Sequence, residues 1–194
     1  MKVELKQLQA AFGTTFVYIT HDQSEALVLS DHVAVMNAGS FEQLGTPQQL
    51  YYQPQTPFVA GFVGANNKLA ASTNTSGAEA GGVVSLTTGD GLALRARAAG
   101  RLQANQAVQA FVRPEAINLA RDATELPSNH TVYAGQVESL LFDGANSAVL
   151  LRETASRTEF RIALPQTGRF ADLRIGETVA FSFDPEQAVC FGNT

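Results

Sequence analysis

Short β-like runs make up most of this chain, and they constrain its fold more than any other feature. Seven runs follow residue 66: Gly82–Thr88, Leu92–Ala98, Ala107–Arg113, His130–Phe142, Ser147–Glu153, Arg157–Leu164 and Glu177–Asp184. Segments rich in Gly, Asn, Ser and Thr lie between them, including the loop Thr73–Gly82 and the turns Asp143–Asn146 and Glu153–Ser156. Many short strands at this spacing predict a small antiparallel barrel over residues 66–194.

A predicted strand that leads directly into a helix organises the first part of the chain. Phe16–Ile19 is an apolar, β-branched and aromatic run, which predicts a buried strand. Thr20 then offers a hydroxyl N-cap, and Gln23 completes a T-x-x-Q capping box for a helix over residues 22–30. His21 therefore stands at the positive end of a helix dipole, where a phosphate is stabilised. By spacing alone, the simpler interpretation is a partly buried histidine that closes a β–α turn.

The segments on either side of this stretch complete a small α/β pattern. Residues 1–12 predict a helix with one apolar face, and Gly13 is a C-terminal stop signal. Asp31–Met36 and Ser40–Leu44 predict two strands around a turn at residues 37–39. Strand, helix and strand in this order are typical of a parallel sheet, whose strands are covered on both faces.

Two short helices follow, and both carry start signals. Thr46 and Pro47 place a threonine cap before a proline at the first helical position, and Gln49 completes a capping box. Thr56 and Pro57 repeat the cap and the proline. The second helix is expected to bury an apolar stripe made of Phe58, Val59, Phe62 and Val63.

Residues 1–67 resemble ABC-transporter ATPases. Ile19–Leu27 (ITHDQSEAL), followed by Ser30–Met36 (SDHVAVM), is similar to the switch segment of that family. Asn37–Pro47 (NAGSFEQLGTP) resembles the hairpin and linker that come next in it. Phe58–Gly64 (FVAGFVG) is typical of importer ATPases of the maltose and polyamine kind. The resemblance implies that His21 contacts the γ-phosphate of ATP in the intact parent and helps to place the attacking water.

Other parts of the ATPase machinery are absent from this sequence. A phosphate-cradling loop needs the pattern G-x-x-x-x-G-K-[S/T], and none of Lys2, Lys6 and Lys68 follows a glycine at that spacing. The signature motif, the magnesium-holding aspartate and the catalytic glutamate of the family are also missing. The resemblance implies that residues 1–65 are the C-terminal part of a nucleotide-binding domain whose parent uses ATP and Mg²⁺. We expect the 194-residue chain alone to hold no cofactor and to be inactive as an ATPase.

Residues 66–194 contain a second motif, Arg113-Pro114-Glu115, at the end of an apolar strand. It resembles the R-P-E motif of the transport-associated OB (TOBE) domain of importer ATPases. Arg113 and Glu115 are candidates for binding a ligand, but a partly buried ion pair at a corner between strands is the simpler interpretation. The expected fold class is an α/β fragment, the tail of a P-loop ATPase domain, followed by a mostly antiparallel OB-like barrel domain.

Composition bears on the class of partner and the compartment. The net charge is −5, and acidic side chains outnumber basic ones both before and after residue 65, which argues against nucleic acid as a partner. Cys190 is the only cysteine, so an internal disulfide is excluded and a reducing compartment fits. No apolar run approaches the ~20 residues of a membrane-spanning helix, and no signal peptide precedes the first helix. We expect a cytoplasmic protein that reaches the membrane only through its partners.

The sequence indicates no metal or nucleophilic centre. The histidines His21, His32 and His130 lie far apart without metal-ligand spacing, and no G-x-S-x-G elbow is present. Asp143 and Glu153 stand in predicted turns and are expected to be solvated.

The favoured function is the C-terminal portion of the ATP-hydrolysing subunit of an ABC importer, with the OB-like domain in dimerisation and regulation. A free-standing regulatory or small-ligand-binding module is the alternative, while acidic charge disfavours an oligonucleotide-binding OB domain. Phe62–Asn67 and the R-P-E motif favour import of polyamines (spermidine or putrescine) over ferric ion or sugar. The expected partners are permease subunits and a second copy, because uncovered apolar strands and OB-like tails both favour pairing.

Overall fold

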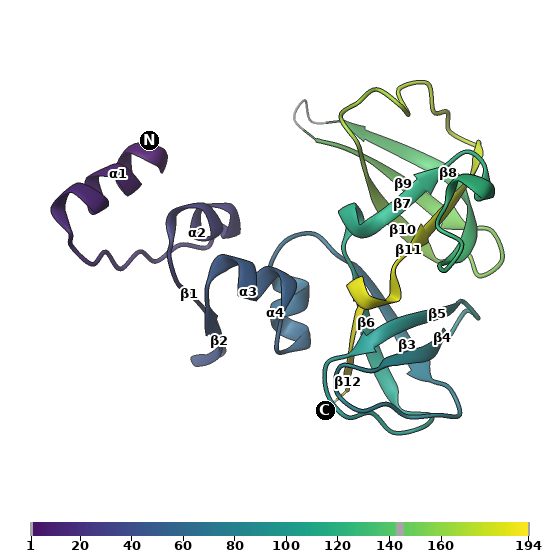
Figure 1. Ribbon diagram of the computed structural model, residues 1–194, viewed down its shortest axis with the longest axis horizontal. Coiled ribbons are helices and arrows are strands. Elements are labelled where there is room, and N and C mark those ends of the chain that lie inside the picture. The colour runs from purple at the N-terminus through teal and green to yellow at the C-terminus, as the bar shows by residue number, and fades with distance from the viewer. Residues whose placement is uncertain (1, 143–145, 194) are drawn as a thin grey trace. The chain divides into compact units, whose positions relative to one another are not determined.

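The structure is a computed structural model that describes residues 2–142 and 146–193, so most of the turn predicted at Asp143–Asn146 lies outside the described residues. The chain forms two compact units, Met1–Gly64 and Ala65–Thr194. Figure 1 shows their elements, and each unit is described by itself.

The described part of the first unit contains helices and one β-hairpin. Its elements are α1 (Lys2–Phe12), α2 (Gln23–Leu29), β1 (Val33–Asn37), β2 (Ser40–Gly45), α3 (Pro47–Tyr52) and α4 (Pro57–Phe62). The hairpin turns at Ala38 and Gly39, whose φ angles of 47° and 83° are both positive, as a two-residue type I′ turn requires. Among the described residues, the predicted first helix and the two strands predicted around the turn at residues 37–39 are confirmed.

Helices α3 and α4 begin with the predicted caps. Thr46 Oγ1 accepts a hydrogen bond from the Gln49 N–H (3.2 Å), and Gln49 Oε1 accepts one from the Thr46 N–H (2.9 Å). Thr56 Oγ1 accepts from the Val59 N–H at 3.2 Å. The caps satisfy N–H groups that a helix leaves without an internal partner, so these short helices start at fixed residues.

A small hydrophobic core holds the hairpin and these two helices together. Its buried members are Val35, Leu50, Val59 and Val63. The predicted apolar stripe of α4 is only partly correct, because Phe62 is 41% exposed. Phe62 stacks on Phe58 at a ring distance of 5.5 Å, which shields one face of each ring.

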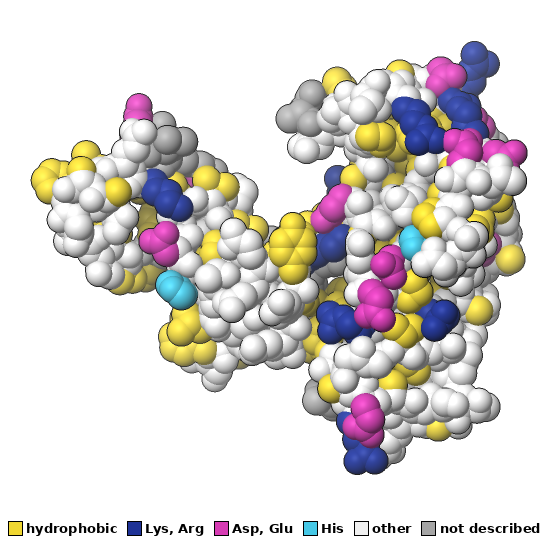
Figure 2. Space-filling model, in the orientation of Figure 1, with side chains coloured by type: hydrophobic (Ala, Val, Ile, Leu, Met, Phe, Trp, Pro, Cys, Tyr) yellow, Lys and Arg dark blue, Asp and Glu magenta, His cyan; other side chains and the backbone are white. Residues whose placement is uncertain are grey.

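The buried strand predicted at Phe16–Ile19 is not formed. The segment has irregular backbone and no strand partner among the described residues, and Val17 and Ile19 are 89% and 92% exposed. A parallel-sheet strand needs neighbours that bond its backbone and elements that cover both faces. In the described part of this unit β1 and β2 pair antiparallel with each other, which also corrects the prediction of a parallel sheet. Figure 2 shows hydrophobic side chains at the surface of this unit.

The second unit is mostly β-structure arranged in two sheets. Its strands are β3 (Asn67–Thr73), β4 (Val83–Thr88), β5 (Ala93–Ala98), β6 (Ala107–Val112), β7 (Ile117–Ala120), β8 (Thr131–Phe142), β9 (Ser147–Glu153), β10 (Glu159–Leu164), β11 (Thr178–Phe183) and β12 (Val189–Gly192). One sheet is a closed barrel in the order β12-β5-β4-β3-β6, in which β12 and β5 are parallel. The other is antiparallel in the order β10-β9-β8-β11-β7.

The prediction for this unit is right in class and incomplete in detail. Each of the seven predicted runs contains a strand, but β3, β7 and β12 were missed. Strands β7 and β12 have only four residues, too few for a period-two pattern to stand out. The predicted single antiparallel barrel is replaced by a barrel with one parallel pair and a separate five-stranded sheet.

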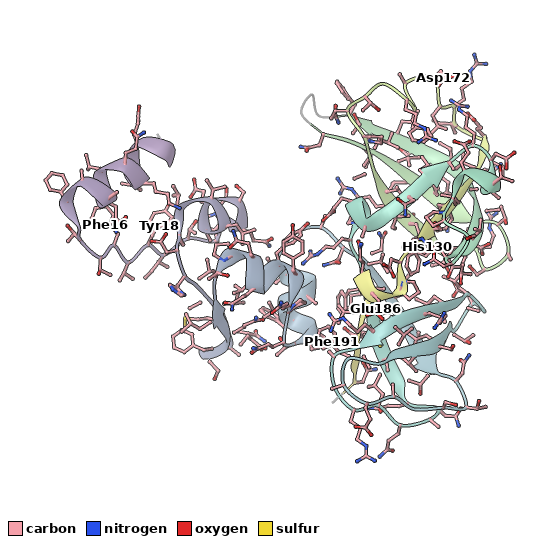
Figure 3. All side chains as sticks on the ribbon, viewed as in Figure 1. Phe16, Tyr18, His130, Asp172, Glu186 and Phe191 are labelled. Atoms are coloured by element: carbon pink, nitrogen blue, oxygen red, sulfur yellow. The ribbon has the colours of Figure 1, made fainter. Side chains whose placement is uncertain are left out.

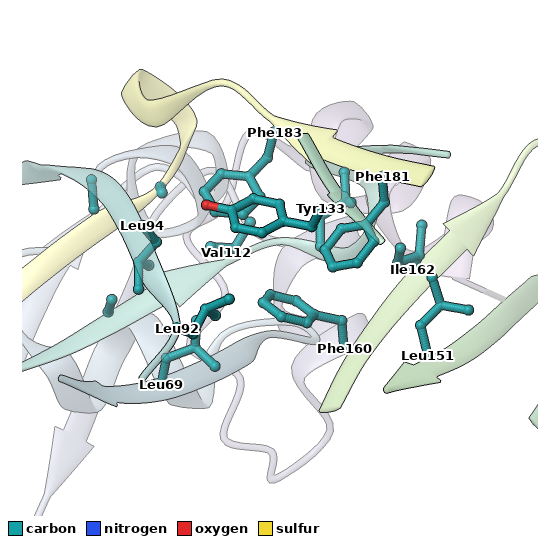
Figure 4. Close-up of a cluster of buried hydrophobic side chains, with 14 of the residues drawn as sticks. Leu69, Leu92, Leu94, Val112, Tyr133, Leu151, Phe160, Ile162, Phe181 and Phe183 are labelled. Carbon is teal, nitrogen blue, oxygen red and sulfur yellow. The ribbon is translucent and has the colours of Figure 1, made fainter. Parts of the chain in front are cut away.

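One continuous hydrophobic core lies between the barrel and the five-stranded sheet (Figure 4). The Tyr133 ring stacks on Phe181 and Phe183 at 5.2 and 5.7 Å, and Phe160 meets Phe181 at 5.0 Å. Barrel residues such as Leu94 belong to the same cluster. The two sheets therefore stabilise each other through shared apolar burial.

Hydrogen bonds between side chains and backbone also tie the two sheets. Tyr133 in β8 donates its hydroxyl proton to the Ala93 carbonyl in β5 at 3.1 Å. Burial raises the pKa of Tyr133 to about 12, so the hydroxyl stays a donor at physiological pH. Thr158, beside β10, donates to Asp90 Oδ2 in the β4–β5 turn at 2.8 Å.

The expectation that Glu153 is solvated is wrong, because its side chain is buried at the end of β9. Glu153 Oε2 accepts hydrogen bonds from the Ala155 N–H (3.1 Å), the Ser156 N–H (2.6 Å) and the Ser156 hydroxyl (2.7 Å). Burial by itself raises the pKa of this carboxyl, but the hydrogen bonds outweigh it and hold the pKa below its ordinary value. The carboxylate organises the β9–β10 turn from inside.

We expect Glu153→Gln to lower the free energy of unfolding by about 1–3 kcal/mol at pH 7, because a neutral amide oxygen accepts these three hydrogen bonds more weakly than a charged carboxylate oxygen does. A carboxyl whose pKa is lower in the folded state stabilises above its unfolded pKa of ~4.3, and this stabilisation is lost as pH falls through the folded pKa. Urea unfolding at pH 7, 5 and 3 should therefore show the difference shrinking with acid. Glu79→Gln, at an exposed site, is the control. A difference as large at pH 3 as at pH 7 would contradict the assignment.

Candidate functional site

His21 lies in the turn that leads into α2, and its imidazole is exposed. The N-cap of α2 is Asp22, whose Oδ1 accepts from the Glu25 N–H at 3.1 Å. Thr20 Oγ1 accepts a hydrogen bond from the N–H of Asp22 itself (2.9 Å), outside the helix. The predicted Thr20–Gln23 capping box is therefore wrong. The aspartate takes the cap because its negative charge also interacts favourably with the helix dipole.

The residues around His21 are held on both sides of the turn. Gln23 Oε1 accepts from the Gly64 N–H at 3.0 Å, which ties the start of α2 to the chain after α4. Tyr18 donates its hydroxyl proton to Glu25 Oε2 at 2.8 Å, and this bond raises the pKa of Tyr18. Figure 3 shows Tyr18 and Phe16 on the segment between α1 and α2. His21 is thus presented to solvent from a turn with fixed neighbours.

The chemistry open to His21 is limited to one hydrogen bond at a time from each ring nitrogen. A neutral imidazole can donate to a phosphate oxygen or accept from a water, and a charged one can donate twice. Within residues 2–142 and 146–193, no group of three or more His, Cys, Asp and Glu side chains could hold a metal ion. Among the described residues His21 is thus a single exposed imidazole that can exchange hydrogen bonds with a ligand.

The R-P-E motif forms the corner where the chain leaves the barrel. Pro114 is buried and begins the 3₁₀ turn η1 (Pro114–Ala116) between β6 and β7, while Glu115 is exposed. Arg113 is half-buried and donates from Nη1 to the Ala65 carbonyl at 3.1 Å. The structure therefore brings the motif together at a crossover between sheets. His21 belongs to the other unit.

Asn67 is a buried residue at this corner that the sequence reasoning missed. Its Nδ2 donates to the Val112 carbonyl (3.1 Å) and to the Arg161 carbonyl (2.9 Å), and its Oδ1 accepts from the Arg161 N–H (2.6 Å). The amide thus bonds both backbone groups of Arg161 as a neighbouring strand would. The one available signal is its spacing of two from Leu69, which places it on the inward face of β3.

Comparison with known proteins first defines the class of the second unit. Residues 110–191 match the family model of the TOBE domain, which confirms that resemblance. The structure is also similar to that of ModG, described as a cytoplasmic molybdate-binding protein, with a TM-score of 0.55 and 18% identity. The match covers 66% of this chain and 96% of ModG, and at this identity it shows the fold alone. None of the described helices is long and apolar enough to cross a membrane.

The particular relatives are ATP-binding subunits of importers, and the chain is homologous to them along nearly its whole length. It is 37% identical over 189 residues to the spermidine/putrescine import ATP-binding protein PotA of Thermobifida fusca, covering 97% of this chain and 47% of that protein. The PotA of Pseudomonas aeruginosa strain UCBPP-PA14 is 37% identical over 95% of this chain and 50% of its own length. The PotA of Acidothermus cellulolyticus is 61% identical over 71 residues. The chain thus spans about half the length of the first two of these relatives.

Proposed function

We propose that this chain is the C-terminal portion of the ATP-hydrolysing subunit of an ABC importer for polyamines. The observation that carries the proposal is the alignment of 97% of the chain with a spermidine/putrescine import ATP-binding protein. The TOBE match within residues 110–191 supports the same class independently of that alignment. In this proposal residues 1–65 end the nucleotide-binding domain, and residues 66–194 form the regulatory OB-like domain.

The contribution of this chain to ATP hydrolysis is the side chain of His21. ATP supplies the reactive γ-phosphate when it is bound with Mg²⁺, and the exposed imidazole fits a hydrogen bond to a phosphate oxygen. The Asp22 cap and the Tyr18–Glu25 hydrogen bond fix the turn, so His21 needs little reorganisation to make that contact. The phosphate-binding loop, the magnesium ligand and the catalytic base belong to the remaining half of the relatives' length.

The proposal also places the subunit in the cell and among its partners. The subunit sits on the cytoplasmic face of the membrane, bound to permease subunits, and pairs with a second copy of itself. The exposed side chains of Val17 and Ile19 are then covered by the rest of the nucleotide-binding domain, which supplies the sheet that Phe16–Ile19 lacks here.

The test is uptake of labelled solutes after disruption of the gene that encodes this sequence. We expect spermidine and putrescine uptake to fall at least about tenfold, since transport stops without ATP hydrolysis. Ferric-ion and maltose uptake in the same cells are the controls. Unchanged polyamine uptake together with loss of ferric-ion or maltose uptake would assign the importer to that other solute, and no change in any solute would reject the proposal.

A further inference from the structure

Strand β8 has an unpaired edge at its far end. Strand β11 pairs with β8 only along Thr131–Gln136, and the last backbone bonds on that side join Val137 to Glu177 and Gly176 (both 2.8 Å). From Glu138 to Phe142, β8 pairs with β9 alone among the described residues. An edge of this kind presents free N–H and C=O groups that can bond another strand.

The register identifies which residues point their backbone groups to this open side. A bulge at Glu138 shifts the pairing, so that Ser139 faces Leu150 and Leu140 faces Val149. Gln136 and Arg152 exchange backbone hydrogen bonds between β8 and β9. Since alternate residues of a strand point their N–H and C=O groups to opposite sides, Leu150 is the next residue of β9 whose backbone groups point to β8, and it bonds Ser139. The N–H and C=O groups of Leu140 and Phe142 therefore point away from β9.

Side chains at this edge are apolar and exposed, and the described residues after Glu138, Ser139–Phe142, carry no charge. The next residue, Asp143, lies outside the described residues. Phe142 is 76% exposed, while Leu140 and Leu141 are each about 40% exposed. Glu138 is already neutralised by Arg152, which donates to both of its carboxylate oxygens (Nη2 to Oε2, 2.9 Å). A second copy of the edge can therefore approach without bringing the two Glu138 carboxylates together unpaired, whereas two free carboxylates at these positions would repel each other.

We propose that a second copy of this chain pairs with the β8 edge, as an antiparallel strand related by a two-fold axis beside Leu141. In this arrangement Leu140 of each copy exchanges two backbone hydrogen bonds with Phe142 of the other, and the apolar side chains of both edges are buried together. The interface is isologous and needs no other protein. The inference deepens the proposed self-pairing of the subunit, on which it rests, by naming the surface that makes it.

Sedimentation equilibrium of the full 194-residue chain and its variants tests the inference. Leu140→Pro removes an outward N–H that the β8–β9 ladder does not use, so an edge strand tolerates it. Phe142→Lys places a charge on the edge at a highly exposed site, where it should not disturb the fold. This second variant keeps the test usable if the proline variant does not fold. We expect each variant to raise the dimer dissociation constant at least tenfold. Val132→Lys, at an exposed apolar site at the opposite end of β8, should leave it unchanged.

The outcomes separate this inference from the proposal beneath it. If the unsubstituted chain is a dimer and both edge variants leave its dissociation constant unchanged, the assignment of the interface to the β8 edge is overturned. The self-pairing itself would then still stand. Loss of association in Ile19→Lys, with none in the edge variants, would assign the contact to the first unit and equally overturn the edge. If the unsubstituted chain stays monomeric at concentrations about 100-fold above micromolar, both the β8-edge interface and the self-pairing are overturned. The transport function would still be decided by the uptake experiment.

Discussion

His21→Ala in the intact ATP-hydrolysing subunit is expected to lower the turnover number about 100-fold or more, with ATP affinity nearly unchanged. The reason is that an imidazole which contacts the γ-phosphate and places water strengthens its interaction as the reaction proceeds, so its loss affects the rate more than binding. The exposed imidazole leaves space for the alanine, and the cap at Asp22 does not involve the His21 side chain. Phosphate release at saturating ATP, together with nucleotide titration, measures both quantities.

The matched control is His32→Ala, because His32 is also exposed and lies just before β1. That variant should keep turnover within about twofold of the parent, which corresponds to ~0.4 kcal/mol of activation free energy. If His21→Ala stays within the same limit, the residue is a solvent-exposed turn histidine and the proposed contact with phosphate is rejected.

Asn67→Ala is expected to cost the second unit about 2–4 kcal/mol of unfolding free energy. The substitution leaves the Arg161 N–H and C=O without the partner that Asn67 provides, and it removes one bond to the Val112 carbonyl. Buried backbone groups that lose their hydrogen bonds keep the cost of desolvation. Asn67→Asp should destabilise as well, because a carboxylate accepts from the Arg161 N–H but cannot donate to either carbonyl.

Chemical denaturation followed by far-UV circular dichroism checks this expectation. Asn118→Ala is the control, since Asn118 is an exposed asparagine in β7 and its change should stay within about 0.5 kcal/mol. Equal effects at the two positions would show that the Asn67 amide does not join β3 to β10 in solution.

The second unit could be read from sequence because its strands carry their own signals. Runs such as Leu92–Ala98 alternate apolar and polar residues, and alternation survives whatever the strand pairs with. The order of strands in the two sheets carries no such signal. Pairing of β12 with both β5 and β6 depends on contacts between residues far apart in the chain, which no local pattern encodes.

In the first unit, a local sequence pattern predicted an element that the structure does not form. Phe16–Ile19 has the composition of a strand, yet a strand forms only where a neighbour accepts its backbone groups, and the described residues supply none. The predicted cap of α2 was wrong for a more local reason. Thr20 and Asp22 both precede the helix, and aspartate is the stronger N-cap residue. The placement of His21 at the start of the helix survived both errors, because it depends only on where α2 begins.

The closed barrel has a consequence for the order in which the protein can be made. Within the second unit, strands β3 to β6 are synthesised first, but β12, which closes the barrel between β5 and β6, comes after the entire five-stranded sheet. Until the final strand is synthesised, the facing edges of β5 and β6 stay unpaired and open to other strands. The barrel can therefore close only after β12 has been made, and because this closure joins strands far apart in the chain, we expect it to be slow.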